Sequence, residues 1–223
     1  MRHAVLGAGG VGGLVGGALA RAGHPVTLLV RPERQRHYPS RLSIESNTLG
    51  TFEAPVRVKD RLDEPFDIVW MTVKATALEA ALEAVSKEEL GSGLLVPLLN
   101  GVEHVTRLRE HYGPERVLPG TIRVEAEQLE PGRVRQLSPF ANVEVTQSPV
   151  TRERAEQLCN ELRAAGLSCE VQDDEVTMLW SKLCFLAPFA LTAYATGVGE
   201  RNMLRSLKQT CSREVDFFYA VPN

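Results

Sequence analysis

The sequence predicts an α/β fold, in which an N-terminal doubly wound parallel sheet is followed by a short all-helical C-terminal domain. Short runs of consecutive apolar residues alternate with helical segments through the first half of the chain, as in parallel sheets covered on both faces. Beyond residue 172 the strand patterns stop, and one long apolar segment of helical composition follows. We therefore expect two domains, at residues 1–171 and 172–223.

The composition is that of a globular protein without a strong charge bias. The chain has 223 residues, a formal net charge of −3, and 43% hydrophobic residues. This charge gives no electrostatic reason to expect nucleic acid or anionic lipid as a partner. No apolar run reaches the roughly 20 residues that span a bilayer, and the four cysteines show no metal or disulfide framework. We expect a cytoplasmic protein with no membrane segment and no metal site.

The first predicted strand leads into a glycine-rich turn. The apolar run at residues 3–6 precedes G-A-G-G-V-G and then a small-residue helix. In this context G-x-G-x-x-G binds a dinucleotide, with its phosphates at the helix N-terminus. Gly7 would make the turn, Gly9 would let the backbone approach the pyrophosphate, and Gly12 would let the helix pack closely. This context favours a Rossmann-type site over an ordinary glycine turn. The predicted nucleotide-binding residues are Gly7, Ala8, Gly9, Gly10, Val11 and Gly12.

The end of the second predicted strand, residues 26–30, indicates which dinucleotide binds. Sites for NAD usually place an acidic residue here, which hydrogen-bonds the ribose. This chain has Arg31 instead, and a guanidinium binds a 2′-phosphate in a bidentate manner. We therefore predict NADP(H) as the cofactor; the alternative is that Arg31 is a solvated loop residue.

Two further strands place polar residues at the edge where parallel sheets bind ligands. The expected strands are residues 67–73 and 94–99, and the expected helices that follow them are residues 75–85 and 102–111. Lys74 and Asn100 come directly after these strands, at their carboxyl ends. Both are candidates to line the cleft. The alternatives are a lysine that extends into solvent and an ordinary Asn-Gly turn.

The remaining segments predict smaller sheets and a long helix. Residues 40–60 indicate a hairpin, and residues 120–145 indicate antiparallel strands with a turn at Pro131-Gly132. A helix over 151–165, ended by Gly166, and a strand over 168–171 complete the first domain. The helix over 177–196 is apolar and contains Lys182. A lysine in an apolar surface needs a partner or a chemical role, so Lys182 is a candidate proton donor; the alternative is that it points into water.

Four segments, in this order and at these intervals, resemble the ketopantoate reductase (2-dehydropantoate 2-reductase) family. They are residues 7–12, Thr72–Ala75, Leu99–Gly101 and Trp180–Leu183. The resemblance implies an NADPH-dependent reduction of a 2-keto acid to a 2-hydroxy acid, in the family's case ketopantoate to pantoate. It also implies that the glycines hold the pyrophosphate and Arg31 the 2′-phosphate. Lys74 and Asn100 would then line the nicotinamide and substrate cleft.

The same resemblance implies that Lys182 is the general acid and that Asn100 orients it or the substrate. The segment after Lys182 departs from the family pattern. It lacks the two asparagines that members commonly carry there, and Pro188 is expected to kink or break the helix. The C-terminal domain is also shorter than in the family, which suggests truncation. In a rival alignment, with an internal deletion, Glu214 would contact the substrate.

Two other functions stay open at this stage, namely an NADP-binding protein with little or no catalysis and a related reductase acting on another carbonyl or imine. The helical tail carries aromatic residues that need a partner surface, so we expect a homodimer. These residues are Phe185, Phe189, Phe217, Phe218 and Tyr219.

Overall fold

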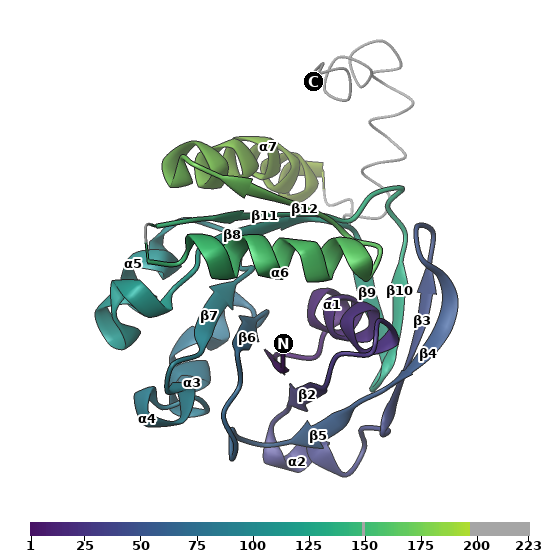
Figure 1. Ribbon diagram of the computed structural model, residues 1–223. Coiled ribbons are helices and arrows are strands. Elements are labelled where there is room, and N and C mark those ends of the chain that lie inside the picture. Colours follow the sequence, from purple (N-terminus) through teal and green to yellow (C-terminus); the bar gives the residue numbers. More distant parts are fainter. Residues whose placement is uncertain (149, 197–223) are drawn as a thin grey trace. The chain divides into compact units, whose positions relative to one another are not determined.

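The computed structural model describes residues 1–148 and 150–196 (Figure 1). The chain divides into two compact units, Met1–Leu179 and a second unit that begins at Trp180. The division comes a few residues into the last helix, whereas the sequence places it at residue 172, before that helix. In the described part of the chain, no helix combines the length and apolar character needed to cross a membrane.

The central sheet has five parallel strands in the order β5-β2-β1-β6-β7. Counted along the chain these are its third, second, first, fourth and fifth strands, which is the order of dinucleotide-binding folds and confirms the predicted α/β class. The chain reverses its direction of winding between β1 and β6, where such sheets open a crevice. The strands are β1 His3–Leu6, β2 Val26–Leu29, β5 Arg57–Lys59, β6 Ile68–Met71 and β7 Leu94–Pro97.

Two smaller sheets complete the first unit, with the orders β4-β3-β10-β9 and β12-β11-β8. Hairpins are confirmed at residues 41–55 and 126–136, including the turn at Gly132, whose φ is 80°, but residues 57–59 of the segment predicted as a hairpin form β5 of the central sheet. The parallel pairing of β10 with β3 joins distant segments that no local pattern links. The strands are β3 Arg41–Ser46, β4 Gly50–Pro55, β8 Gly120–Arg123, β9 Ala126–Glu130, β10 Arg133–Gln136, β11 Asn142–Thr146 and β12 Ser168–Gln172.

The predicted helices lie where the sequence places them and differ in detail, and the structure adds two short helices that were not predicted, α2 (Pro32–Gln35) and α4 (Lys87–Leu90). The segment expected as one helix from residue 75 is a 3-10 turn followed by a short helix, and the last helix continues through Pro188 rather than breaking there. The α-helices are α1 Gly10–Arg21, α2 Pro32–Gln35, α3 Leu78–Glu83, α4 Lys87–Leu90, α5 Glu103–Tyr112, α6 Arg152–Ala164 and α7 Glu175–Thr196. The 3-10 turns are η1 Ala75–Ala77 and η2 Pro114–Arg116.

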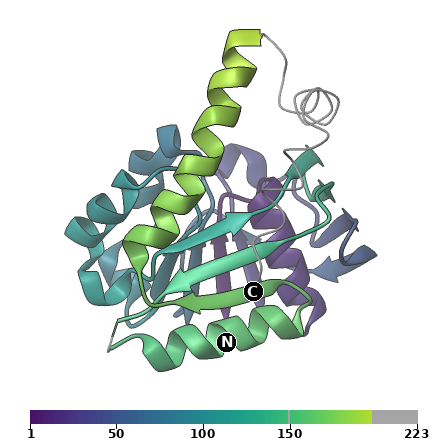
Figure 2. The ribbon, with the colours of Figure 1, turned by 90° about the horizontal axis from the view of Figure 1, so that it is seen from above.

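Helix α6 runs beside β12 in both ribbon views (Figure 1 and Figure 2). A disulfide between Cys159 on α6 and Cys169 on β12 joins the two elements. The sequence showed no disulfide framework, so this pair was not predicted. Nothing in the spacing of the cysteines indicated it, because the contact depends on how α6 packs against its strand.

Helix α1 packs between two sheets through glycines on two of its faces. A Cβ at Gly12 or Gly16 would meet side chains of β1 or β2, whereas one at Gly13 or Gly17 would meet side chains of β10 or β3. Each pair is one turn apart, so each forms a flat strip on one side of the helix. The helix therefore comes closer to both sheets than larger side chains would allow.

The start of α7 is fixed to the first unit. Asp174 accepts hydrogen bonds from the backbone N–H and the hydroxyl of Thr177, which satisfies part of the first helical turn. Arg109 of α5 makes a bidentate ion pair with Glu175, at 2.8 and 2.6 Å. Beside it, Val105 packs with two residues of the next turn, Met178 and Leu179.

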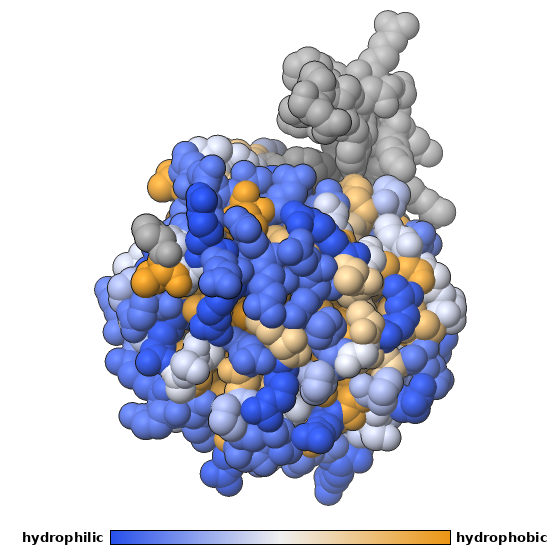
Figure 3. Space-filling model, in the orientation of Figure 1, coloured by the Kyte–Doolittle hydropathy of each residue, from blue (hydrophilic) through white to orange (hydrophobic). Residues whose placement is uncertain are grey.

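The face of the molecule in Figure 3 is mainly hydrophilic, with apolar residues scattered over it. Large apolar side chains that are exposed in the described residues include Leu129, Val150, Val176 and Trp180. Scattered apolar side chains of this kind are normal for a folded protein in water.

Two glycine substitutions on the same face of α1 are expected to have different effects. The Cβ of Gly12→Ala would collide with the Gly7 carbonyl oxygen and Thr72 Oγ1, whereas that of Gly16→Ala would lie 3.3–3.4 Å from valine and leucine methyls. We expect Gly12→Ala to lower the free energy of unfolding by about 2 kcal/mol or more. Gly16→Ala should change it by less than about 1 kcal/mol, because alanine favours the helix. Urea unfolding of both variants tests this, and equal losses would contradict it.

Candidate functional site

The parallel sheet gathers most of the predicted site at one edge. The glycine turn follows β1, Arg31 follows β2, Lys74 follows β6 and Asn100 follows β7. Because these strands are parallel, their carboxyl ends lie at the same edge, which is where open α/β sheets bind ligands. The first unit therefore brings together the predicted groups that fall within it.

The glycine turn has the geometry that its sequence predicts. Gly7 has a φ of 102°, and a Cβ there would lie 2.9 Å from the carbonyl carbon of Thr72. A Cβ at Gly9 would meet no atom within 4 Å, so the turn is open on that side. Gly12 lies against the Gly7 carbonyl oxygen, too close for any side chain. The turn is thus sharp, open at Gly9 and closely packed at Gly12.

The N-terminus of α1, where Gly9 is the N-cap residue, has no capping side chain and no acidic residue in its first turn. The first N–H groups of a helix have no partner within the helix, and the macrodipole adds about half a positive charge there. A phosphate group fits this arrangement.

Two side chains that the sequence did not indicate also contact the turn. Tyr38 Oη donates to the carbonyl oxygen of Ala8 at 2.8 Å, and Gln128 Nε2 donates to the same oxygen at 2.7 Å. They lie 30 and 120 residues from Ala8 along the chain. No local pattern could have found them, since only the packing of β9 against α1 brings Gln128 to the turn.

The polar groups along the edge are solvent-accessible. The side chain of Arg31 is 68% exposed, and its Nε lies 3.4 Å from a carboxylate oxygen of Glu33, which is also exposed. Lys74 and Asn100 are exposed as well, and Gly101 turns the chain after Asn100 with a φ of 92°. All three predicted side chains are thus available to a ligand at this edge.

The predicted general acid, Lys182, lies on α7 in the second unit. Its side chain is buried, with 6% of its surface exposed, so the alternative of a lysine pointing into water is wrong. Glu214, Phe217, Phe218 and Tyr219 lie outside the described residues, as do the side chains of Phe185 and Phe189.

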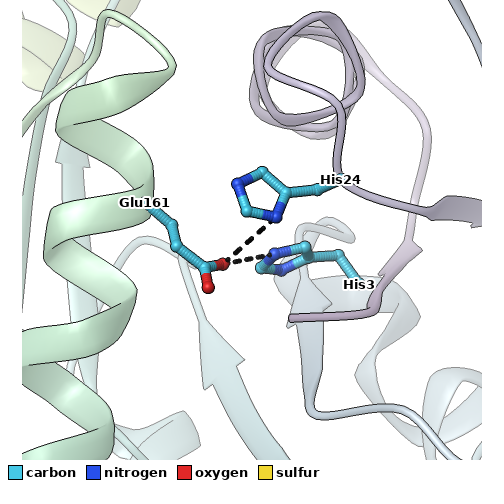
Figure 4. Close-up of side chains that lie close together, drawn as sticks. All are labelled: His3, His24 and Glu161. Carbon is cyan, nitrogen blue, oxygen red and sulfur yellow. Dashed lines mark hydrogen bonds and ion pairs between the residues drawn. The ribbon is translucent and has the colours of Figure 1, made fainter.

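A second cluster of ionisable groups lies at the opposite, amino edge of the central sheet. His3 begins β1, His24 comes just before β2, and both rings point toward Glu161 on α6 (Figure 4). The Glu161 carboxylate lies 3.0 Å from His3 Nε2 and 3.6 Å from His24 Nδ1. The ammonium group of Met1 lies 2.9 Å from its other oxygen.

Two histidines and a carboxylate are a common metal-ligand set. A metal ion would need a free lone pair on a ring nitrogen of His3, and both ring nitrogens of His3 already take part in hydrogen bonds. The indole N–H of Trp70 donates to His3 Nδ1 at 3.3 Å, so this nitrogen is the acceptor. In the neutral ring the proton is then on Nε2, which donates to Glu161. A metal ion at Nε2 would require this proton to move to Nδ1, which already accepts the hydrogen bond from the Trp70 N–H. The cluster is therefore built as a hydrogen-bonded ion-pair network.

The environment lowers two pKa values in this network. Burial is the main cause that lowers the pKa of His3, and the hydrogen bond to Glu161 only partly opposes it. Burial alone would raise the pKa of Glu161, but the hydrogen bonds from His3 and the N-terminal ammonium outweigh it and bring the pKa to about 2. At neutral pH the network therefore contains a neutral His3 and an ionised Glu161.

The turn, the sheet order and the edge residues define a Rossmann-type nucleotide-binding fold. The family model described as ketopantoate reductase PanE/ApbA matches residues 3–148 of this chain. The chain belongs to that family.

Individual relatives agree with this assignment. An uncharacterized oxidoreductase of Bacillus subtilis is 32% identical over 139 residues, covering 62% of this chain and 46% of the relative. The 2-dehydropantoate 2-reductase of Mycobacterium tuberculosis is 31% identical over 185 residues, covering 81% of this chain and 59% of the relative. This chain therefore spans about half to three fifths of the length of these curated relatives. The crystal structure of 2-dehydropantoate 2-reductase from Geobacter metallireducens has a TM-score of 0.73 and 27% identity, covering 85% of this chain and 64% of that one.

The amino-edge network is expected to make the fold sensitive to acid. Both lowered pKa values mean that the unfolded chain takes up protons before the folded one, so stability falls as the pH falls. The loss should begin below the ordinary histidine pKa of 6.5 and continue from the ordinary glutamate pKa of 4.5 toward the Glu161 pKa of about 2. Urea midpoints measured at several pH values in this range would show it.

The variant Glu161→Gln removes the acidic group and keeps the size of the side chain. We expect it to be less stable than the wild type near pH 7 and to lose less stability on acidification below pH 4.5. The variant Glu153→Gln, at an exposed position on the same helix, is the matched control. The same acid-induced loss in Glu161→Gln and in the wild type would contradict the assignment.

Proposed function

We propose that this protein is an NADPH-dependent oxidoreductase that reduces a 2-keto acid to a 2-hydroxy acid, with 2-dehydropantoate to pantoate as the candidate reaction. The observation that carries the proposal is the open glycine turn at the N-terminus of α1, with Arg31, Lys74 and Asn100 at the same sheet edge. Family membership supports it, as does the name 2-dehydropantoate 2-reductase that several relatives carry.

In this proposal the first unit binds the dinucleotide. The N–H groups at the start of α1 hold the pyrophosphate, and Gly9 lets it approach the backbone. Arg31 binds the 2′-phosphate through its guanidinium. The guanidinium would then leave the nearby Glu33 carboxylate and pair with the phosphate, which carries more negative charge. Lys74 and Asn100 line the part of the cleft that takes the nicotinamide and the substrate.

The chemistry requires a proton donor beside the ketone. When bound, the reduced nicotinamide supplies the hydride that reaches the ketone carbon. Negative charge then develops on the ketone oxygen, where the Lys182 ammonium stabilises it and donates the proton that completes the hydroxyl group. Asn100 orients the lysine or the substrate by hydrogen bonding.

The sequence after Lys182 favours a second candidate. Residues 183–192 contain no asparagine, so the wall expected to bind a polar acid is apolar. This favours a dinucleotide-binding protein with little catalysis, or a reductase that acts on another carbonyl. NADPH oxidation measured with a panel of 2-keto acids distinguishes these candidates. No turnover with any member, in a sample that binds NADPH, would contradict the reductase proposal.

We also propose that the protein is cytoplasmic and forms a homodimer. Membership of the reductase family supports that location. The aromatic residues of the helical tail, which need a partner surface, support the dimer.

The choice of cofactor is tested by Arg31→Ala. We expect the Kd for NADPH to rise about 10- to 100-fold, because a charge-assisted hydrogen bond to the 2′-phosphate is lost. The Kd for NADH, which lacks that phosphate, should change by less than about threefold. Fluorescence titration measures both constants. The variant Arg41→Ala, an exposed arginine on β3, is the control, and an equal loss for both cofactors would contradict the role of Arg31.

The role of the buried lysine is tested by Lys182→Ala. If Lys182 is the general acid, kcat should fall about 100- to 10,000-fold, while the Kd for NADPH stays close to that of the wild type. The variant Lys87→Ala, at an exposed position on α4, is the control. A kcat within about threefold of the wild type would exclude Lys182 as the proton donor.

A further inference from the structure

The carbonyl group of Ala8 is held by a closed triangle of hydrogen bonds. Tyr38 Oη and Gln128 Nε2 both donate to it, at 2.8 and 2.7 Å, and Gln128 Nε2 also donates to Tyr38 Oη at 2.6 Å. Because the three atoms form a nearly equilateral triangle, one amide N–H of Gln128 is shared between the two oxygens, and the hydroxyl proton of Tyr38 goes to the Ala8 carbonyl. Tyr38 follows α2 and Gln128 lies on β9, so two distant segments hold one peptide of the turn.

This peptide is the part of the turn where a change of orientation would matter most. Ala8 lies between two glycines, whose backbones rotate easily because they lack a side chain. A carbonyl oxygen rotated toward the N-terminus of α1 would place partial negative charge where the phosphates bind. The other end of the same peptide is also held, since the N–H of Gly9 donates to the Gly7 carbonyl oxygen at 2.7 Å.

We propose that Tyr38 and Gln128 are positioning residues for dinucleotide binding. They fix the Ala8 carbonyl away from the phosphates, and so keep the first N–H groups of α1 directed at the pyrophosphate. The inference rests on the proposed dinucleotide function. It assigns a role to two side chains that come from outside the glycine motif and act on the cofactor through the backbone of the turn.

The variant Tyr38→Phe removes one donor and keeps the ring. We expect the Kd for NADPH and the Kd for NADH to rise by the same factor, about three- to tenfold, because both cofactors contain the pyrophosphate. Binding of adenosine 2′-monophosphate, which has no pyrophosphate, should stay unchanged. The double variant Tyr38→Phe/Gln128→Met loses both donors and should bind the two dinucleotides more weakly still.

The matched control is Tyr112→Phe. The hydroxyl of Tyr112, on α5, donates to the carbonyl oxygen of Val85 at 2.6 Å, so this variant removes a comparable hydrogen bond away from the turn. We expect it to lower the Tm and to leave every Kd unchanged. Circular dichroism of all variants establishes that they are folded before the titrations are compared.

The possible outcomes separate this inference from the function on which it rests. A wild-type protein that binds neither NADPH nor NADH contradicts the proposed function itself. If the wild type binds and Tyr38→Phe binds equally well, the positioning role is wrong. An equal loss of adenosine 2′-monophosphate binding would show that Tyr38 contacts the adenosine directly, and an equal loss in Tyr112→Phe would show a general effect of stability. Either result would overturn the inference.

Discussion

Helix α1 approaches the sheets on both sides of it closely, and this packing arranges the first unit around the glycine turn. Gly12 touches the backbone of the turn that leads into the helix, and Gly13 and Gly17 leave room for side chains of β10 and β3. A helix with larger residues at these positions could not lie between the two sheets. Gly10, at the start of the same helix, lies against the backbone of β9 at Ala126 and so leaves β9 close enough for Gln128 to reach Ala8.

The charged groups at the two edges of the central sheet are arranged differently: those at the amino edge pair with one another, and those at the carboxyl edge face a possible ligand. At the amino edge, the Glu161 carboxylate is matched by His3 and the Met1 ammonium, and the hydrogen-bonding atoms of His3 are used within the protein. At the carboxyl edge, the start of α1 has no acidic partner and Arg31 is exposed. Groups that satisfy one another stabilise the fold, whereas a helix N-terminus without an acidic partner attracts an anion. The proposed function belongs to the second edge for this reason.

Much of the fold could be predicted from the sequence because its signals are local. A continuous apolar run such as Ile68–Met71 indicates a buried parallel strand, and the glycine spacing after β1 indicates a sharp turn into a helix. Residues that directly follow such strands, including Lys74 and Asn100, could therefore be placed at one edge. The parallel pairing of β10 with β3 could not be predicted, because pairing between distant segments depends on packing against α1.

The class of fold, the glycine turn and the side chains that follow the strands could be inferred from the amino-acid sequence, since each is specified by residues within one strand and the turn after it. The groups that meet from distant positions depend on how the sheets and helices pack. These are Tyr38 and Gln128 on the Ala8 carbonyl, His3 with Glu161, and Cys159 with Cys169. A single side chain produces no repeating pattern in the sequence and does not indicate which distant residue it will contact. Contacts of this kind form only when the sheets and helices pack.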